Sequence, residues 1–273
     1  MSLRNEQCFQ ELADGLKELA QGKPMVEILN SGNWGDALIL AGQERFFADV
    51  GIEVERIRVQ KLSKTKRSKE LFRRYIKKRR AIFTGSGALR KHYKRPEQFQ
   101  DAARQFEHVL VMPSSYEFAI DHDPKHMTFW RRDNLESVAS MPDARFCHDL
   151  AFYLQPAARE VTQEFGFFFR EDVERASFDV PEGNVDISAE QTHAFDIEPF
   201  FDRVGACKIV HTNRLHVGIA ATLLGREVHL YPSVNTKLES IYQASMRPFF
   251  DNVVYHDAPS TELYALAQKM AEA

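Results

Sequence analysis

The sequence predicts an α/β protein with two Rossmann-like domains and a cleft between them. Short apolar runs typical of buried strands alternate with runs of helical periodicity along the chain. The polar candidate residues follow the ends of predicted strands, which is where open parallel sheets bind ligands. Because both halves show this alternation, we place one domain at residues 1–155 and the other at 156–273, with the boundary near Pro156.

The composition indicates a globular protein without a membrane span. The chain has 273 residues, of which 44% are hydrophobic, and this is enough for a full core. The N-terminus is polar, and no run approaches the roughly 20 apolar residues that a spanning helix needs. The three cysteines lack metal-type spacing, which favours free thiols in a reducing compartment. We therefore expect a cytoplasmic protein.

Positive charge gathers in residues 61–80, which carry a net charge of +10 and leave −13 on the rest of a chain whose total is −3. The apolar residues of this segment fall on one face of a predicted helix. A solvated helix face is the simplest interpretation, and contact with a membrane surface or an anionic acceptor is the alternative. Nucleic acid is not an expected partner, because the remainder is acidic and carries no nucleic-acid motif.

The first half of the chain begins with a predicted helix over Glu6–Leu19, where apolar residues repeat at intervals of three and four. A strand, a turn and a helix are expected next, over Met25–Leu29, Asn30–Asp36 and Ala37–Val50. Later strands are predicted over Ile52–Val59, Ala81–Thr84 and Val109–Met112.

The second half is predicted to continue the alternation of helices and strands. Gly225 ends the helix that follows Arg214, because glycine accepts the left-handed cap conformation at little cost. The expected elements are a connector and helix over Gln155–Glu164, a strand over Gly166–Phe169, a loop with a short strand over Asn184–Ala189, a helix over Thr192–Val204, a strand at Lys208–Val210, a helix from Leu215, a strand over Glu227–Tyr231, a helix over Thr236–Ala244, a strand over Val253–Tyr255 and a last helix over Pro259–Ala271.

A glycine-bearing loop joins the first predicted strand to the helix that follows it. Gly32 and Gly35 allow backbone N–H groups to approach a ligand, and the helix N-terminus adds positive potential. This geometry suits phosphate, although many βα turns that contain glycine have the same pattern.

Arg214 and His216 form a second candidate site at the start of the helix after Lys208–Val210. Arginine offers a planar donor fork to a carboxylate or phosphate, and histidine exchanges a proton near neutral pH. Together at a helix N-terminus they suggest an anion site with a proton donor. The alternative is a surface arginine beside a capping histidine.

The segment Asp121–His126 has the composition of a metal site, but Pro124 opposes a helix that would present both histidines on one face. We expect no metal there, and His122 is a candidate substrate contact.

The residues Asn213-Arg214-Leu215-His216-Val217-Gly218, followed by Ala220-Ala221 and Gly225, resemble the signature of the polysaccharide pyruvyl transferase family. Gly32-Asn33-Trp34-Gly35-Asp36 resembles the opening G-N-x-G-D motif of the same family. Weaker similarities are found in Gly85-Ser86-Gly87, in Arg132-Asp133 with Ser137, in Asp149-x-Ala151-Phe152 and in Arg170-x-Asp172-x-Glu174. Ser114 departs from the family's Pro-Gln-Ser segment, in which Ser115 matches. The resemblance extends from Gly32 to about Tyr255 and implies the two-domain fold called GT-B.

The resemblance implies transfer of pyruvate from phosphoenolpyruvate to a sugar of a cell-surface glycan or exopolysaccharide, with formation of a cyclic ketal. His216 would be the general acid, raised toward the imidazolium form by nearby anions, and Arg214 would clamp an anion of the donor. No metal or cofactor is needed beyond phosphoenolpyruvate as co-substrate, and the acceptor would be a glycan or lipid-linked sugar. The expected substrate-binding residues are Arg170, Arg132, Asn33, Gly35, Asp36, Gly85, Ser86, Gly87 and Ser115.

Two other functions are compatible with these residues. The first is a GT-B glycosyltransferase with a nucleotide-sugar donor, because a His-x-Gly-x-Ala pattern before a glycine also resembles nucleotide-sugar sites. The second is a non-catalytic scaffold of glycan synthesis that kept the fold. Retention of both Arg214 and His216 argues against the scaffold, whereas the missing glutamine at Ser114 leaves it open.

Overall fold

The computed structural model of the chain describes residues 2–29, 32–58, 79–86, 89, 104–172, 174–188 and 196–272. Contacts within the chain divide it into two compact units. We call them the N-terminal unit (Arg4–Ser31 and Gly42–Tyr153) and the C-terminal unit (Met1–Leu3, Gly32–Ala41 and Leu154–Ala273). The predicted domains and their boundary near Pro156 stay a prediction.

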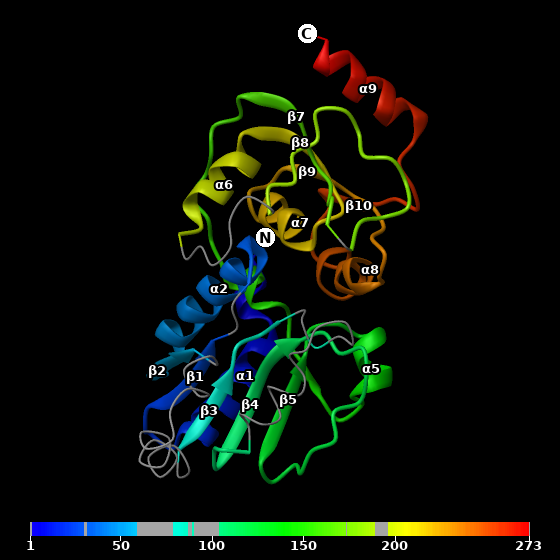
Figure 1. Ribbon diagram of the computed structural model, residues 1–273. Helices are drawn as coiled ribbons and strands as arrows, with labels where there is room; N and C mark the ends of the chain where they lie inside the picture. The colour runs from blue at the N-terminus through cyan, green and yellow to red at the C-terminus, as the bar shows by residue number, and fades with distance from the viewer. Residues whose placement is uncertain are drawn as a thin grey trace. The chain divides into compact units, whose positions relative to one another are not determined.

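The N-terminal unit contains a six-stranded parallel sheet in the order β2-β1-β3-β4-β5-β6, and Figure 1 labels β1 to β5. The strands are β1 (Met25–Leu29), β2 (Val54–Arg58), β3 (Arg80–Phe83), β4 (His108–Ser114), β5 (Met127–Arg131) and β6 (Arg145–Phe146). After β1 the chain adds β2 on one side and then β3 on the other, so the strand order reverses between β1 and β3. Such a switch point is where open α/β sheets bind ligands, beyond the carboxyl ends of the strands.

Helices α1 (Gln7–Ala20) and α2 (Trp34–Val50) follow the predicted periodicity. One face of α1 is buried, with Phe9, Leu12, Ala13, Leu16 and Ala20 in the core. Gly42 of α2 lies so close to the short 3-10 helix η3 (Leu150–Tyr153) that a Cβ atom there would be 1.9 Å from the Leu150 carbonyl oxygen. Further helical elements among the described residues are η1 (Leu3–Asn5) and α5 (Glu136–Ser140).

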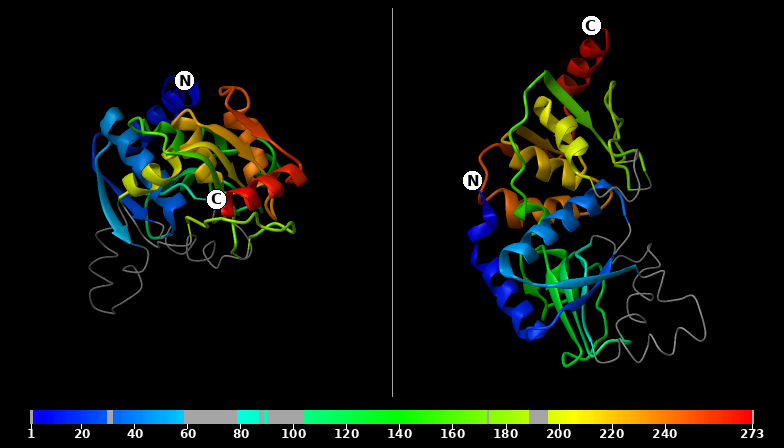
Figure 2. Two further views of the ribbon diagram at one scale, coloured as in Figure 1. Left: turned by 90° about the horizontal axis from the view of Figure 1, so that it is seen from above. Right: turned by 90° about the vertical axis from the view of Figure 1, so that its left-hand side faces the viewer.

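The C-terminal unit contains a four-stranded parallel sheet in the order β10-β9-β8-β7. Its strands are β7 (Gln163–Phe168), β8 (Cys207–Thr212), β9 (Glu227–Leu230) and β10 (Val253–Tyr255), and its helices are α6 (Glu198–Gly205), α7 (Leu215–Leu223), α8 (Lys237–Ile241) with a π-helical turn at Tyr242–Met246, and α9 (Thr261–Ala271). Figure 2 shows the same elements in two further views.

The two faces of this second sheet are packed differently. Helix α7 packs against β8 and β9, and Gly218 permits the approach because a Cβ atom there would lie 2.7 Å from Leu230 Cδ2. On the other face, Phe167 and Tyr231 share a core with Leu263 of α9. Gly225 ends α7 with a φ of 69°, as the sequence predicts.

Three stacked histidines also lie across this sheet. The ring of His211 is 4.6 Å from that of His229, and His229 is 5.1 Å from His256, measured between ring centroids. His211 Nδ1 lies 3.0 Å from the Tyr231 hydroxyl. Burial, followed by the neighbouring histidines, lowers the pKa of His211 to about 3, so this ring is neutral at physiological pH.

Most predicted elements are confirmed, and three predictions need correction. The short strand expected within Asn184–Ala189 does not form over residues 184–188, the part that the structure describes. Helix α2 begins at Trp34 rather than Ala37, because the Asn33 carbonyl oxygen accepts the Ala37 N–H at 3.1 Å and so starts the helix earlier. No helix forms over residues 155–164. This segment is extended, and the N–H groups of Thr162 and Gln163 each donate to the Ala206 carbonyl oxygen at 2.9 Å, which leads the chain into β7.

Several other predictions fall wholly or partly outside the described residues. Residues 61–78 of the basic segment and residues 189–195 are not described, and Arg80 belongs to β3. Among the helices that the structure describes, none has the length and apolar character needed to cross a bilayer.

Candidate functional site

The carboxyl ends of β7 and β8 are tied together by side chains of the turn that leads into α7. The Thr212 hydroxyl donates to the Phe168 carbonyl oxygen at 2.6 Å and accepts the Arg214 N–H at 3.0 Å. Asn213 Oδ1 accepts the Arg170 N–H at 2.7 Å. These bonds hold the backbones of Arg170 and Arg214 at the same sheet edge.

Asp186 holds the guanidinium of Arg214 with a two-point contact. Arg214 Nε and Nη2 donate to Asp186 Oδ1 and Oδ2, each at 2.5 Å, and the two side chains are only 5% and 8% exposed. Asp186 Oδ2 also accepts the Glu171 N–H at 2.9 Å. Burial acts to raise the pKa of Asp186, but the Arg214 and Glu171 bonds outweigh it, and the pKa is lowered below its usual value. Asp186 is therefore an ionised support that fixes the plane of Arg214.

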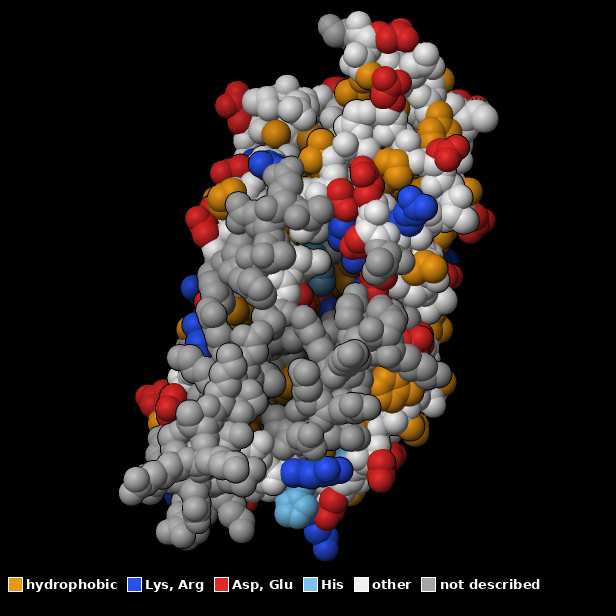
Figure 3. Space-filling view, in the orientation of Figure 1, with side chains coloured by type: hydrophobic (Ala, Val, Ile, Leu, Met, Phe, Trp, Pro, Cys, Tyr) orange, Lys and Arg blue, Asp and Glu red, His pale blue; other side chains and the backbone are white. Residues whose placement is uncertain are grey.

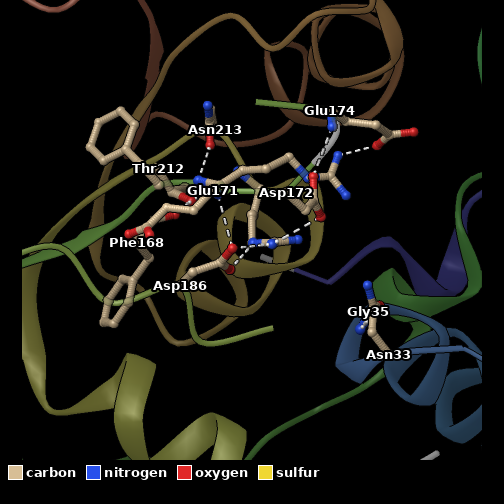
Figure 4. A network of polar contacts seen from close by, with 12 residues as sticks. Asn33, Gly35, Phe168, Glu171, Asp172, Glu174, Asp186, Thr212 and Asn213 are labelled. Carbon is tan, nitrogen blue, oxygen red and sulfur yellow. Dashed lines mark hydrogen bonds and ion pairs between the residues drawn. The ribbon is translucent and has the colours of Figure 1, made fainter. Parts of the chain in front are cut away.

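Asp172 bridges the two arginines. Its Oδ2 atom lies 3.2 Å from Arg214 Nη2, and its Oδ1 atom lies 3.0 Å from Arg170 Nε. Unlike Asp186, the Asp172 side chain is 39% exposed. The carboxylate of Asp172 thus occupies the kind of position between two cations that the carboxylate or phosphate of a ligand would take (Figure 4).

Glu174 completes the network, because it contacts both Arg170 and a further cation, Lys237 of α8. Arg170 Nη1 donates to Glu174, and Lys237 Nζ lies 3.6 Å from Glu174 Oε2. Glu174 is 2% exposed, so its charge is compensated by both cations. The cations Arg170, Arg214 and Lys237 are thus balanced by Asp172, Glu174 and Asp186. Figure 3 likewise shows acidic and basic side chains interspersed on the visible face.

His216 is the second residue of α7 and packs against the glycine motif at the start of α2. A Cβ atom on Gly35 would lie 2.4 Å from His216 Nδ1 and 3.2 Å from Asn33 Oδ1. Asn33 Oδ1 accepts the Gly35 N–H at 2.9 Å, and Asp36 Oδ2 accepts the Asn33 N–H at 3.2 Å. The structure therefore brings together five of the predicted residues, namely Asn33, Gly35, Asp36, Arg214 and His216, and all lie in the C-terminal unit with Arg170.

Other predicted residues lie in the N-terminal unit, where they are bonded to one another. The Ser86 N–H donates to Ser114 Oγ at 3.1 Å, and the Ser115 N–H donates to the Ser86 carbonyl oxygen at 3.2 Å. Arg132 Nε donates to Ser115 Oγ at 3.0 Å, and its Nη1 donates to Asp149. Arg132 and Asp149 are both fully buried, so this ion pair ties the end of β5 to the segment after β6. A role for Ser115 and Arg132 in substrate binding stays a prediction.

Asp133 and Ser137 have a structural explanation. Asp133 Oδ1 accepts the N–H groups of Leu135 and Ser137 at 3.2 and 2.9 Å, which caps the start of α5. Ser137 Oγ in turn accepts the Tyr116 N–H at 2.9 Å. These bonds stabilise the loop after β5 without a ligand.

The remaining candidates lie elsewhere in the N-terminal unit. His122 Nδ1 is 2.8 Å from the Ile120 carbonyl oxygen, and its ring packs on Phe129 at 4.6 Å. The part of the chain that the structure describes contains no group of three or more His, Cys, Asp or Glu residues suited to a metal ion. Gly85 is buried after β3, and Gly87 lies outside the described residues.

Sequence reasoning missed Asp186 and Lys237. Asp186 lies in the loop after β7, and only its contact with Arg214, distant in sequence, reveals its importance. Lys237 opens α8 and looks like an ordinary solvated lysine in the sequence. No local pattern distinguishes either residue.

The fold and this site define an α/β protein with a paired-arginine site beside a histidine at a helix N-terminus. The sequence profile of the polysaccharide pyruvyl transferase family matches residues 33–231, which is most of the chain. The protein therefore belongs to the polysaccharide pyruvyl transferase family, a family of transferases.

A functionally uncharacterised protein from Klebsiella pneumoniae has a similar crystal structure. The similarity covers 92% of this chain and 99% of that chain, with a TM-score of 0.74 and 24% sequence identity. At this identity the comparison shows a shared fold. No curated protein matches the sequence.

Proposed function

We propose that the protein transfers pyruvate from phosphoenolpyruvate to two hydroxyl groups of a glycan or lipid-linked sugar, forming a cyclic ketal. The observation that supports this most is the placement of Arg214 and His216 at the start of α7, with His216 packed against Gly35. Family membership supports pyruvyl transfer on a glycan. Two Rossmann-like domains around an active-site cleft are part of this proposal.

Donor binding depends on which carboxylate leaves the arginines. Asp186 is buried and makes two short bonds to Arg214, whereas Asp172 is more exposed and makes one contact with Arg214 at 3.2 Å and one with Arg170 at 3.0 Å. An incoming carboxylate or phosphate would therefore displace Asp172 and keep Asp186. Among the described residues, none bonds to Nη1 of Arg214, and this nitrogen would be a further donor to the ligand.

The backbone of α7 adds further donors. Its first N–H groups have no acceptor within the helix, and the helix dipole is positive at this end. Because the side-chain charges of the network balance, these N–H groups would supply the additional attraction for the anionic phosphoenolpyruvate.

His216 would deliver the proton that starts the reaction. Protonation of the methylene carbon of phosphoenolpyruvate turns that carbon into a methyl group and makes the neighbouring carbon electrophilic. A sugar hydroxyl then adds to this neighbouring carbon and loses its proton. Phosphate leaves as a second hydroxyl closes the ketal and loses its own proton, so the overall products are one ketal and one inorganic phosphate.

The variants Arg214→Lys and His216→Gln test these roles, with donor affinity measured by calorimetry and phosphate release measured with an acceptor sugar. Lysine keeps the charge opposite Asp186 but loses the planar fork, so donor affinity should fall by about 1.5–3 kcal/mol. Glutamine cannot protonate carbon, so His216→Gln should retain affinity and lose about 10²–10⁴-fold in turnover.

The outcome that contradicts the proposal is specific. If a thermal-shift screen finds stabilisation by nucleotide sugars and none by phosphoenolpyruvate, the protein is a glycosyltransferase. If neither class of ligand binds, the scaffold interpretation is favoured.

Peripheral membrane contact through residues 61–80, on the cytoplasmic side, is a separate proposal that comparison of anionic and neutral vesicles would test.

A further inference from the structure

Two of the three cysteines meet in the N-terminal unit. Cys8 lies in the first turn of α1, and Cys147 directly follows β6. The two segments are in contact, because the ring of Phe9 is 5.9 Å from that of His148. Within this contact the side chains of Cys8 and Cys147 are close enough for each to shift the pKa of the other's thiol. The thiols are free, with Cys147 fully buried and Cys8 partly exposed.

The surroundings make the two sulfur atoms chemically different. Hydrogen bonds from Cys147 and His148 lower the pKa of the Cys8 thiol to about 5, although burial opposes the change. Burial first, and the bond to Cys8 second, raise the pKa of Cys147 well above its usual value. Cys8 therefore has the nucleophilic thiolate and the exposure to meet an oxidant, while Cys147 remains a protected thiol beside it.

We propose that Cys8 and Cys147 form a reversible disulfide when the protein is exposed to a peroxide. The Cys8 thiolate attacks one oxygen of hydrogen peroxide, the O–O bond breaks, and Cys8 sulfenic acid and one water form after uptake of one proton. The Cys147 sulfur then attacks the sulfenic sulfur, and the hydroxyl leaves with the Cys147 proton as a second water. The two thiols lose two electrons in total, which reduce one peroxide to two waters.

The cross-link would join α1 to the segment that carries Asp149. Cys147 is two residues from Asp149, the buried partner of Arg132. Oxidation would therefore connect α1 covalently to the residues at the carboxyl edge of the N-terminal sheet. This inference does not depend on the proposed transferase activity.

The test is a peptide map of the full chain after treatment with hydrogen peroxide and alkylation under denaturing conditions. We expect a peptide pair linked through Cys8 and Cys147 and a fully alkylated Cys207, and we expect dithiothreitol to restore three alkylated cysteines. Cys207 is an internal control, because burial raises the pKa of its thiol to about 11.

Two variants separate the steps. Cys147→Ser should leave Cys8 sulfenic acid open to trapping by dimedone, and Cys8→Ser should leave Cys147 reduced at the same peroxide dose. The inference is overturned if the wild-type map shows three alkylated cysteines after peroxide, or Cys8 oxidised beyond sulfenic acid with Cys147 still free. The wild-type map decides the question even if a variant does not fold.

Discussion

His216 Nδ1 occupies space that a side chain on Gly35 would need, because a Cβ atom there would approach it to 2.4 Å. Two motifs far apart in the sequence thus depend on each other. The absence of a side chain at Gly35 allows the proposed proton donor its position at the start of α7.

We predict that Gly35→Ala displaces the His216 ring. Phosphate release should fall at least about tenfold, because small misplacement of a catalytic group is costly. Gly15→Ala in α1 is the control, since its new Cβ atom would make only an ordinary 3.6 Å contact with Trp130 and alanine favours a helix. Activity assays on both variants provide the measurement, and equal activities would show that His216 tolerates the shift or has another role.

Replacement of aspartate by asparagine should have opposite effects on phosphoenolpyruvate affinity at Asp172 and at Asp186. Asp172→Asn removes a carboxylate that competes with the donor for both arginines, so phosphoenolpyruvate should bind several-fold more tightly. Asp186→Asn weakens the support of Arg214, so donor binding should weaken, by about 1.5–3 kcal/mol if a charged hydrogen bond is lost. Calorimetry with phosphoenolpyruvate checks both. Weaker binding in both variants would mean that Asp172 supports the arginines rather than competing with the ligand.

Removing one partner of the buried Arg132–Asp149 pair should lower the free energy of unfolding more than replacing both partners. Asp149→Ala leaves a buried arginine without its carboxylate, so the free energy of unfolding should fall by about 3–5 kcal/mol. Replacing both residues by apolar ones, as in Arg132→Met with Asp149→Leu, should cost less than the single change.

The matched control is the exposed Lys208–Glu164 pair, whose side chains are 59% and 54% exposed. Glu164→Ala there should change the free energy of unfolding by less than about 1 kcal/mol. Urea unfolding of all the variants gives the comparison. A similar loss in Asp149→Ala and Glu164→Ala would contradict the importance of the buried pair.

His211 should make the fold sensitive to acid. Its pKa in the folded protein is about 3, below its ordinary value of 6.5, so the unfolded chain takes up a proton that the folded chain refuses. Stability from this group is therefore complete above pH 6.5 and falls by about 1.4 kcal/mol per pH unit as the pH drops toward 3.

The variant His211→Gln should show a shallower loss of stability between pH 6 and 4, the range that lies between about 3 and 6.5. His126→Gln is the control, because the His126 side chain is 66% exposed. Unfolding midpoints across pH give the slope, and identical slopes in wild type and His211→Gln would contradict this prediction.

Local patterns were sufficient to predict most of the regular elements. Strands β1 and β10 have the bounds that the sequence predicts, because an apolar run between polar turn residues defines a buried strand. The helix expected over residues 155–164 is wrong, because its backbone bonds to Ala206, a partner that local periodicity cannot reveal. The early start of α2 depends on the backbone bond between Asn33 and Ala37, which composition alone does not specify.

The site was predictable only in part for a similar reason. Arg214, His216 and the glycine motif carry their chemistry in residue type and spacing. The supporting roles of Asp186 and Asp172 come from tertiary contacts with Arg214. Whether Arg132 binds substrate remains a prediction, and its burial with Asp149 shows that an arginine in a motif can also stabilise the fold.

The placement of residues 32–41 in the C-terminal unit has a consequence for folding during synthesis. These residues leave the ribosome early, yet their partners come much later in the chain, as the Trp34–Phe200 ring contact at 5.6 Å illustrates. The C-terminal unit has its full set of contacts only after the residues that follow Leu154 have also been made. Since contacts distant in sequence slow folding, the first turn of α2 should gain protection from hydrogen exchange later than the strands of the N-terminal sheet.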